Sequence, residues 1–222
     1  MKIIKRYIRN HEALMNFLSS IYRVIMLNCV KNRRGLKISR RGVFCKRTKI
    51  INSGSENILV IGKASRIINC TFHFFGDGNV VDIANDCMLK DLDLWISDGG
   101  KVQIGHNTYF IGQIHIACIE GKTVSIGERC LFSTEITIRT GDSHSILNEK
   151  GSRINQGKDI YVGNHVWVGQ KVIILKGANI GDESVVGTQA LVTGKNFPHN
   201  TIIAGSPAKI IKENISWDHR TL

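Results

Sequence analysis

An aliphatic residue recurs at every sixth position over a long stretch towards the C-terminal end of this chain. These positions are Val162, Val168, Ile174, Ile180, Val186 and Val192. A smaller residue (valine, alanine or serine) follows four positions after each of the first five, and glycine directly follows four of the six. A six-residue period fits neither an α-helix nor the alternation of an ordinary sheet. It is typical of solenoids that stack one coil on the next.

Each hexad predicts one short strand and one corner. The aliphatic residue and the small residue four positions later point inward, where successive coils stack about 4.8 Å apart. Glycine or a small polar residue turns the corner. Three corners close a triangular coil, and a single coil cannot bury its own inner face, so many coils must stack.

Earlier coils follow the same rule more loosely. Their aliphatic positions are Ile61, Ile83, Ile104 and Ile126, which are 21 or 22 residues apart, or three hexads plus a short loop. In these coils Cys87 and Cys130 occupy the small inward position. We therefore expect both to be buried, chemically inert thiols.

The net charge of +12 is concentrated at the N-terminal end. Residues 1–50 hold 14 basic residues and one acid, whereas residues 51–222 hold 16 basic and 17 acidic residues. Apolar residues spaced by three and four over the first 30 positions predict an amphipathic helix. The sequence thus predicts a basic helical arm over 1–50, a β-solenoid over 51–212 and a short C-terminal tail over 213–222.

The basic arm suggests contact with another surface. We expect it to cover the open N-terminal end of the solenoid, with contact to anionic lipid or an acidic polysaccharide as an addition. It lacks a regular pattern of interleaved aromatic residues, so nucleic acid is not an expected partner. The six cysteines form no CxxC motif and no signal peptide or membrane-spanning segment is evident, which favours the cytoplasm, with peripheral attachment at the inner face of the membrane.

The hexads break after Ile138 and resume at Val162. The intervening stretch is polar and contains three glycines, so residues 139–159 are predicted to leave the solenoid as a loop. Long loops on regular scaffolds often carry function. This one contains His144, within Gly-Asp-Ser-His-Ser.

Three segments resemble the hexapeptide-repeat acyltransferases: Ile160-Tyr-Val-Gly-Asn-His-Val-Trp-Val-Gly-Gln, Ile174-Leu-Lys-Gly-Ala-Asn-Ile-Gly and Ala204-Gly-Ser-Pro-Ala-Lys209. The resemblance covers about residues 55–212 and is greatest for the branch that O-acetylates sugars, including capsular polysaccharides. It implies a left-handed parallel β-helix, a homotrimer with sites between adjacent subunits, and acetyl-CoA as co-substrate.

The resemblance also implies roles for individual residues. His144, which lies 23 positions before Trp167, would be the general base, with Asp142 as a candidate to hold its tautomer. Trp167 occupies an outward position and would form a wall for the pantetheine arm or the acceptor sugar. Asn164 and His165 would lie beside the acceptor or the subunit interface.

Further residues are implied for the co-substrate. The pantetheine arm would pass Gly169, Gly187 and Thr188. Lys195, Lys209 and Lys212 are the candidates for contact with the phosphates of coenzyme A, with Lys176 as a weaker one.

Imidazole suits this reaction because a sugar hydroxyl is a weak nucleophile near neutral pH and needs a base to take its proton. We therefore expect direct O-acetylation of a surface-polysaccharide sugar. The alternatives are an amino-sugar N-acetyltransferase, a serine O-acetyltransferase and a non-enzymatic β-solenoid scaffold. No metal is expected, because the spacing of His106, His115, His144 and His165 does not match a zinc site.

Overall fold

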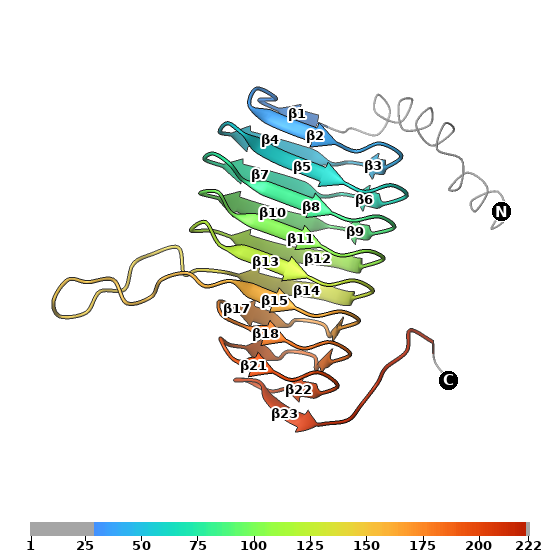
Figure 1. Ribbon diagram of the computed structural model, residues 1–222, viewed down its shortest axis with the longest axis vertical. Helices are drawn as coiled ribbons and strands as arrows, with labels where there is room; N and C mark the ends of the chain where they lie inside the picture. The colour runs from blue at the N-terminus through green and yellow to red at the C-terminus, as the bar shows by residue number, and fades with distance from the viewer. Residues whose placement is uncertain (1–28, 221–222) are drawn as a thin grey trace.

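The computed structural model describes residues 29–220, which form a parallel β-helix of 23 strands (Figure 1). Each coil contributes one strand to each of three faces, which we call A, B and C in the order in which the chain first visits them. The edges between them are named by the two faces that they join. Parallel pairing links each strand to the next coil along all three faces.

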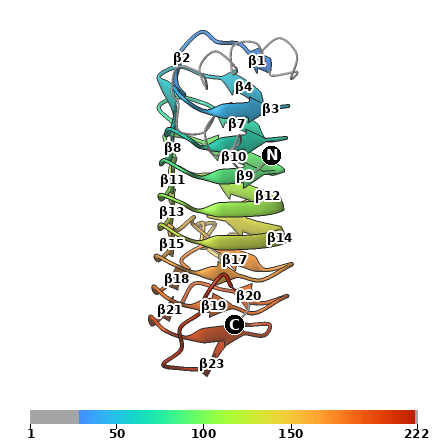
Figure 2. The ribbon, with the colours of Figure 1, turned by 90° about the vertical axis from the view of Figure 1, so that its right-hand side faces the viewer.

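The strands of face B are β2 (Leu36–Ser39), β5 (Asn57–Ile61), β8 (Val80–Ile83), β11 (Lys101–Ile104), β13 (Thr123–Ile126), β15 (Ile160–Val162), β18 (Asn179–Ile180) and β21 (Asn196–Phe197). Face A contains β1 (Cys29–Lys31), β4 (Lys49–Ser53), β7 (Thr71–Phe75), β10 (Leu92–Ser97), β17 (Ile173–Leu175) and β20 (Leu191–Val192). Face C contains β3 (Phe44–Lys46), β6 (Arg66–Ile68), β9 (Met88–Lys90), β16 (Trp167–Val168), β19 (Val185–Val186) and β22 (Ile202–Ala204). Figure 2 shows the face B strands stacked in one column along the long axis.

Three strands depart from this simple pattern. β12 (Tyr109–Cys118) and β14 (Leu131–Arg139) bend around the edge between faces C and A and so belong to both. β23 (Lys209–Lys212) turns back and pairs antiparallel with β22, so the parallel stacking of face C ends at this strand.

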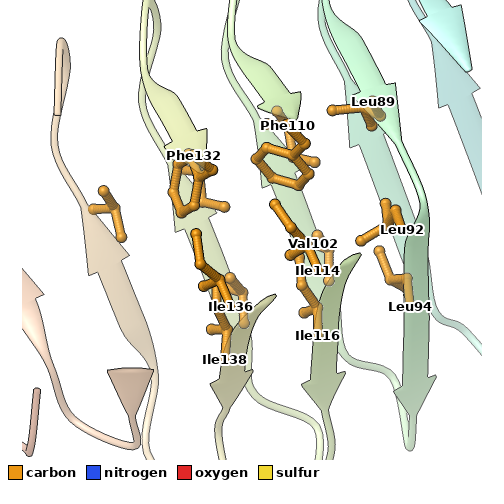
Figure 3. Packing of buried hydrophobic residues seen from close by; sticks show 14 of the residues in the cluster. Leu89, Leu92, Leu94, Val102, Phe110, Ile114, Ile116, Phe132, Ile136 and Ile138 are labelled. Atoms are coloured by element: carbon orange, nitrogen blue, oxygen red, sulfur yellow. The ribbon is translucent and has the colours of Figure 1, made fainter. Parts of the chain in front are cut away.

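The core is a set of inward-facing columns that run through successive coils. Phe110 pairs in register with Leu89 on one side and Phe132 on the other, and the two phenylalanine rings lie 4.8 Å apart. Figure 3 shows these side chains in one row, with rows of leucine and isoleucine beside it. Stacking at the coil spacing therefore brings identical or similar side chains into contact.

The hexad positions behave as predicted. All six aliphatic residues from Val162 to Val192 are buried, and so are the small residues that follow them. Cys87 and Cys130 are buried in the small inward position, and desolvation raises the pKa of both thiols to about 11. Thiols with such pKa values are protonated at neutral pH and do not act as nucleophiles.

The predicted helical arm over 1–50 is wrong for its second half. Residues 29–50 form β1, β2, β3 and the start of β4, and residues 1–28 lie outside the described residues, as does the predicted helix there. Alternating inward residues, such as Leu36 and Ile38 on β2, mark these strands. Nine of the fourteen basic residues lie at 31–49, and their density at outward positions hides the alternation.

Among residues 29–220, no helix is long and apolar enough to span a bilayer.

Candidate active site

The predicted loop leaves the β-helix at the edge between faces A and B (Figure 1). β14 ends at Arg139 and β15 begins at Ile160. The segment between them folds back on itself: Leu147 and Arg153 form an antiparallel bridge, and the Ile154 N–H donates to the Ile146 carbonyl at 2.9 Å. The loop is therefore a hairpin that projects from the regular coils.

Asn155 holds the strand of the hairpin that carries His144. Its amide nitrogen donates to the Asp142 carboxylate and to the His144 carbonyl, both at 2.8 Å. Its amide oxygen accepts from the Ile146 N–H at 2.8 Å. Because Asn155 is only 8% exposed, these bonds fix the backbone on both sides of His144. The sequence analysis missed this residue, because an asparagine in a polar loop carries no distinguishing pattern.

Charged side chains attach the hairpin to the coils beneath it. Lys176, on the next coil, donates to the Asp142 carboxylate and to the Asn155 carbonyl. Arg153 pairs with Glu120 at 2.7 Å, and Glu120 also accepts from the Gly157 N–H. The hydrogen bond from Lys176 holds the pKa of Asp142 below its usual value, and the hydrogen bond from Arg153 does the same for the pKa of Glu120.

The His144 side chain is exposed, and among residues 29–220 its imidazole has no hydrogen-bond partner. Asp142 was predicted as the residue that holds the tautomer of His144. The structure instead places its carboxylate against Lys176 and Asn155. Asp142 therefore supports the loop on which His144 lies, and does not contact the imidazole. Lys176 is likewise used by the loop and is not free to meet a phosphate.

Trp167 lies at the start of face C and points outward, with 42% of its surface exposed. On the next coils Val185 and Ile202 lie in register with Trp167. Two residues farther along these strands, Gly187 and Ala204 are half-buried and lie close together. A Cβ added to Gly187 would lie 2.9 Å from the Cβ of Ala204. Trp167 thus borders a strip of largely bare backbone, and the exposed Thr188 lies at its margin.

Other residues predicted to contact the co-substrate separate into two groups. Lys209 pairs in register with Ala204 and so lies beside this strip. Lys212 pairs with Ile202 on the same strand of face C. Lys195 precedes β21 at the edge between faces A and B, on another side of the β-helix. Gly169 is buried, and a Cβ there would lie 2.8 Å from the Thr188 amide nitrogen. Glycine is therefore needed at position 169, because a side chain there would keep the two coils from packing this closely.

His165 is held on its outer side by the C-terminal tail. Its Nδ1 lies 2.6 Å from the Glu183 carboxylate. The Trp217 ring stacks on the imidazole at 4.3 Å, and the Trp217 Nε1–H donates to the His165 carbonyl at 2.7 Å. Trp217 also lies 6.0 Å from Trp167. Sequence analysis gave the tail no role in the site.

The C-terminal tail, residues 213–220, is irregular and runs back along the edge between faces B and C. The Ile215 N–H donates to the Asn200 carbonyl at 3.0 Å, and the His219 ring lies 6.5 Å from that of Tyr109. Aromatic contacts along the edge stabilise this course in place of helical hydrogen bonds.

Asn164 lies at the same edge and is used by the fold. Its side-chain oxygen accepts from the Glu128 N–H at 3.0 Å, and its own N–H donates to Asp182 at 2.7 Å. These bonds join three successive coils. Asn164 therefore has a structural role, and its contact with the acceptor stays a prediction.

One chain does not bring His144 and Trp167 together. The hairpin leaves at the edge between faces A and B, and Trp167 follows the edge between faces B and C, so face B separates them. The strand and corner that make up one face, six residues in all, span at most about 20 Å. The hairpin and the tail project on opposite sides of the β-helix (Figure 1). The hairpin also exposes Ile146, Leu147 and Ile154 by 55–59%, an apolar surface suited to a second copy.

Histidines and acids do not gather around a metal position. Among residues 29–220, no group of three or more histidine, cysteine, aspartate or glutamate side chains is arranged to hold an ion. His106 and His165 lie on one edge of the β-helix, His115 on face A and His144 on the hairpin.

Comparison with known proteins identifies the class. No family model matches the chain. A polysialic acid O-acetyltransferase of Neisseria meningitidis is 36% identical over 174 residues, which are 78% of this chain and 80% of that protein. A crystal structure of a polysialic acid O-acetyltransferase superposes with a TM-score of 0.82 at 33% identity, covering 88% of this chain and 92% of the other. That of an acetyltransferase specific for polysialic acid gives 0.77 at 31% identity, covering 87% and 85%.

The fold and these relatives define a hexapeptide-repeat acyltransferase. The chain belongs to the sugar O-acetyltransferase branch of that family, which the polysialic acid O-acetyltransferases represent among its relatives. The predicted left-handed parallel β-helix and the predicted O-acetyltransferase class are confirmed. The N-acetyltransferase, serine O-acetyltransferase and scaffold alternatives are not favoured.

Proposed function

We propose that this enzyme transfers the acetyl group of acetyl-CoA to a hydroxyl group of an acidic surface polysaccharide. The observation that carries the proposal is the pairing of two elements within one fold. An exposed histidine lies on a braced hairpin, and an exposed tryptophan borders a strip of bare backbone. Relatives that act on polysialic acid support an acidic capsular sugar as the acceptor.

The strip beside Trp167 fits a thin, flexible ligand. Pantetheine is such a chain, and the half-buried Gly187 and Ala204 leave room for it along face C. Trp167 would form one wall at the thioester end. Lys209, which lies beside Ala204 on the last strand, is the residue best placed to meet a phosphate at the other end. Lys195 lies at the edge that carries the hairpin, and within one chain it does not reach this strip.

His144 would act as the general base. Its imidazole takes the proton of the acceptor hydroxyl as that oxygen attacks the thioester carbonyl carbon. A C–O bond forms and the C–S bond breaks. The proton then passes to the departing sulfur, which gives the acetylated sugar and free coenzyme A. No acyl-enzyme is needed. Asn155 and Asp142 would hold the histidine in place and do not themselves touch the reacting atoms.

We propose that the working unit is a cyclic homotrimer. Face B separates His144 from Trp167 in one chain, so the hairpin of one subunit would reach the Trp167 face of its neighbour. A head-to-tail contact of this kind closes into a ring and repeats the same site at each interface. The exposed apolar side chains of the hairpin would be buried in that contact.

Attachment to the inner face of the membrane stays a prediction, as does a cytoplasmic location. The basic residues at 31–49 now belong to the first coils of the β-helix. They present a basic end surface that suits anionic lipid or an acidic polymer.

Replacement of His144 tests the proposal. With acetyl-CoA and oligosialic acid as substrates, release of free thiol should fall by roughly 10²- to 10⁴-fold in His144→Ala. The protein should keep its oligomeric state in size-exclusion chromatography with light scattering. His199→Ala is the matched control, because His199 is also exposed but lies at the far end of the β-helix. Turnover close to that of the wild type in His144→Ala would contradict the assignment.

A further inference from the structure

A pocket of about 280 Å³ opens where face C meets the edge between faces B and C, in the N-terminal coils. None of the site residues described above lines it. Its lining residues include Arg66, Asp86, Met88, His106, Asn107 and Tyr109. These side chains come from three successive coils, so the pocket is a feature of the stacked structure and cannot be formed by any one hexad.

The pocket shares a column of face C with Trp167. Arg66 pairs with Met88, and Met88 pairs with Tyr109. The same register continues from Tyr109 through Leu131 to Trp167. At about 4.8 Å per coil, Tyr109 lies about 10 Å and Arg66 about 19 Å from Trp167 along the axis. The strip proposed for pantetheine runs from Trp167 in the opposite direction. This side of Trp167 is therefore left for the acceptor, beside the tail residues Trp217 and His219.

The side chains of the pocket suit a sugar that carries a carboxylate. Arg66 is exposed, and among residues 29–220 its guanidinium has no ion-pair partner. A free guanidinium binds a carboxylate through two parallel hydrogen bonds. The Tyr109 hydroxyl donates to Asn107 at 2.8 Å, and this pair can exchange hydrogen bonds with sugar hydroxyls. Met88 and the Tyr109 ring supply an apolar surface for the sugar ring.

Asp86 is the one acidic group in the lining. Its carboxylate lies 3.7 Å from the His106 Nδ1, so it faces the histidine side of the pocket and can accept from a hydroxyl. The coils beyond the pocket carry Arg40, Arg41 and Lys63 on the same edge, with no acid between residues 40 and 55. The surroundings are therefore basic on the side away from Trp167, which favours an anionic polymer over a neutral one.

We propose that this pocket binds an anionic sugar unit of the acceptor. This unit lies several sugars along the saccharide from the unit that is acetylated beside Trp167. This proposal rests on the proposed function, because it takes the acceptor to be the acidic saccharide of that reaction. The span between Arg66 and Trp167 is one that an oligosaccharide covers and a monosaccharide does not. The pocket would therefore make the enzyme prefer longer acidic acceptors.

Steady-state kinetics of Arg66→Gln test the pocket. The acceptors are oligosialic acids of increasing length and the same oligomers with their carboxylates reduced to alcohols. For the long acidic oligomer, KM should rise about 10-fold in Arg66→Gln, because a charge-assisted pair is lost. The KM for acetyl-CoA and kcat should be unchanged. Lys101→Gln, on exposed face B, is the matched control, and Arg66→Lys should retain part of the affinity.

The reduced oligomer completes the test. Wild type and Arg66→Gln should have equal KM for the reduced oligomer, because the ion pair requires both the sugar carboxylate and the guanidinium. The proposal is overturned if Arg66→Gln and wild type have equal KM for the long acidic oligomer, or if Lys101→Gln raises it equally. A rise in the KM for acetyl-CoA would instead assign Arg66 to the phosphates of coenzyme A, and would also overturn it.

Equilibrium binding separates this proposal from the proposed function. Isothermal titration with oligosialic acid in the absence of acetyl-CoA requires no catalysis. If wild type binds and Arg66→Gln binds about 10-fold more weakly, the pocket stands whatever His144→Ala shows. If His144→Ala loses turnover as expected while Arg66→Gln binds like wild type, the pocket proposal alone fails.

Discussion

The edge between faces A and B and the edge between faces B and C each carry half of the proposed site, and they are built from different interactions. The hairpin with His144 is held by charged and amide groups, namely Asp142, Lys176 and Asn155 at its base. The surface with Trp167 is held by rings, with Trp217 stacked on His165. One edge projects a residue into solvent, and the other presents a flat wall.

The difference follows from what each half has to do. A hairpin that leaves the coils buries little apolar surface within its own chain, so directional hydrogen bonds must fix its course. A tail that runs along an edge can bury aromatic rings against the coils. This contact buries apolar area and does not require precise hydrogen-bond geometry. The two halves face different directions, so a complete site requires two copies of the chain. Four experiments test this difference between the two edges.

The largest effect is expected when the two halves are placed on separate chains. His144→Ala and Trp167→Ala should each be nearly inactive alone. In mixed trimers, each ring that contains both variants has one interface with an intact histidine and an intact tryptophan. Random assembly from equal amounts should therefore restore about a quarter of wild-type turnover overall, and about a third in the isolated mixed rings. Co-expression with two affinity tags and sequential purification isolates the mixed rings.

Absence of any recovery in the mixed rings would contradict a site shared between subunits. The control is a mixture of the two separately purified variants that is assayed before subunits can exchange, which should stay inactive. A ring with one doubly changed chain and two wild-type chains should keep one intact interface of three, and so about a third of wild-type turnover, whereas sites within single chains would leave about two thirds.

The next largest effect is expected from Asn155→Ala on the hairpin. The change releases the backbone on both sides of His144, so the base is misplaced in the neighbouring site. We expect kcat to fall roughly 10- to 100-fold with the KM for acetyl-CoA unchanged. Asn148→Ala, at the hairpin turn, is the matched control. An unchanged kcat with lowered stability alone would show that Asn155 is structural only.

The charged base of the hairpin predicts a pH dependence that the aromatic edge lacks. The pKa values of Asp142 and Glu120 are lowered in the folded protein, so their contribution to loop stability is complete above the ordinary carboxylate pKa. It is lost as the pH falls through the lowered values, which places the change below about pH 4. Hydrogen exchange, corrected for intrinsic rates, should show the hairpin amides losing protection before those of β18.

Asp142→Asn serves as the control for the pH experiment. This variant should show weaker protection of the hairpin at pH 7 and a smaller change on acidification. Equal protection of the wild-type hairpin at pH 7 and pH 3 would mean that the ion pairs do not hold it.

The smallest effect is expected from Trp217→Ala on the tail. One stacked aromatic pair contributes about 0.5–1.5 kcal/mol, so the melting temperature should fall by only a few degrees. Loss of the support beside Trp167 should raise the KM for acetyl-CoA several-fold, as measured by titration. Trp95→Ala is the matched control, because Trp95 also makes ring contacts at the surface but lies on face A, away from this edge. Equal effects of the two changes would exclude a specific role for the tail.

The hexads and the hairpin show how far the sequence reaches. The inward positions from Val162 to Val192 follow from a six-residue period, because identical coils repeat one local rule. The position of the hairpin follows from the break in that period. The helical arm was extended too far because basic residues at outward positions of β2 and β3 hid the alternation of their inward partners. A repeating pattern of inward residues can be recognised in a sequence only where the outward residues do not obscure it.

The partners of individual side chains were not accessible in this way. Asp142 was assigned to His144 by its nearness in the chain, whereas its carboxylate lies against Lys176, 34 residues away. Trp217 meets His165 across 52 residues. Such pairs depend on how many residues each coil contains, and a difference of one residue changes which side chains face each other.

The coiled architecture, the outward position of Trp167 and the place where the chain leaves the coils follow from the amino-acid sequence, because each depends on a short repeating pattern. Three relations instead come from the folded chain: face B separates the two halves of the proposed site, the tail returns to the edge beside Trp167, and Arg66 lies in one column with Trp167. These relations join coils far apart in the chain, and stacking in three dimensions sets them.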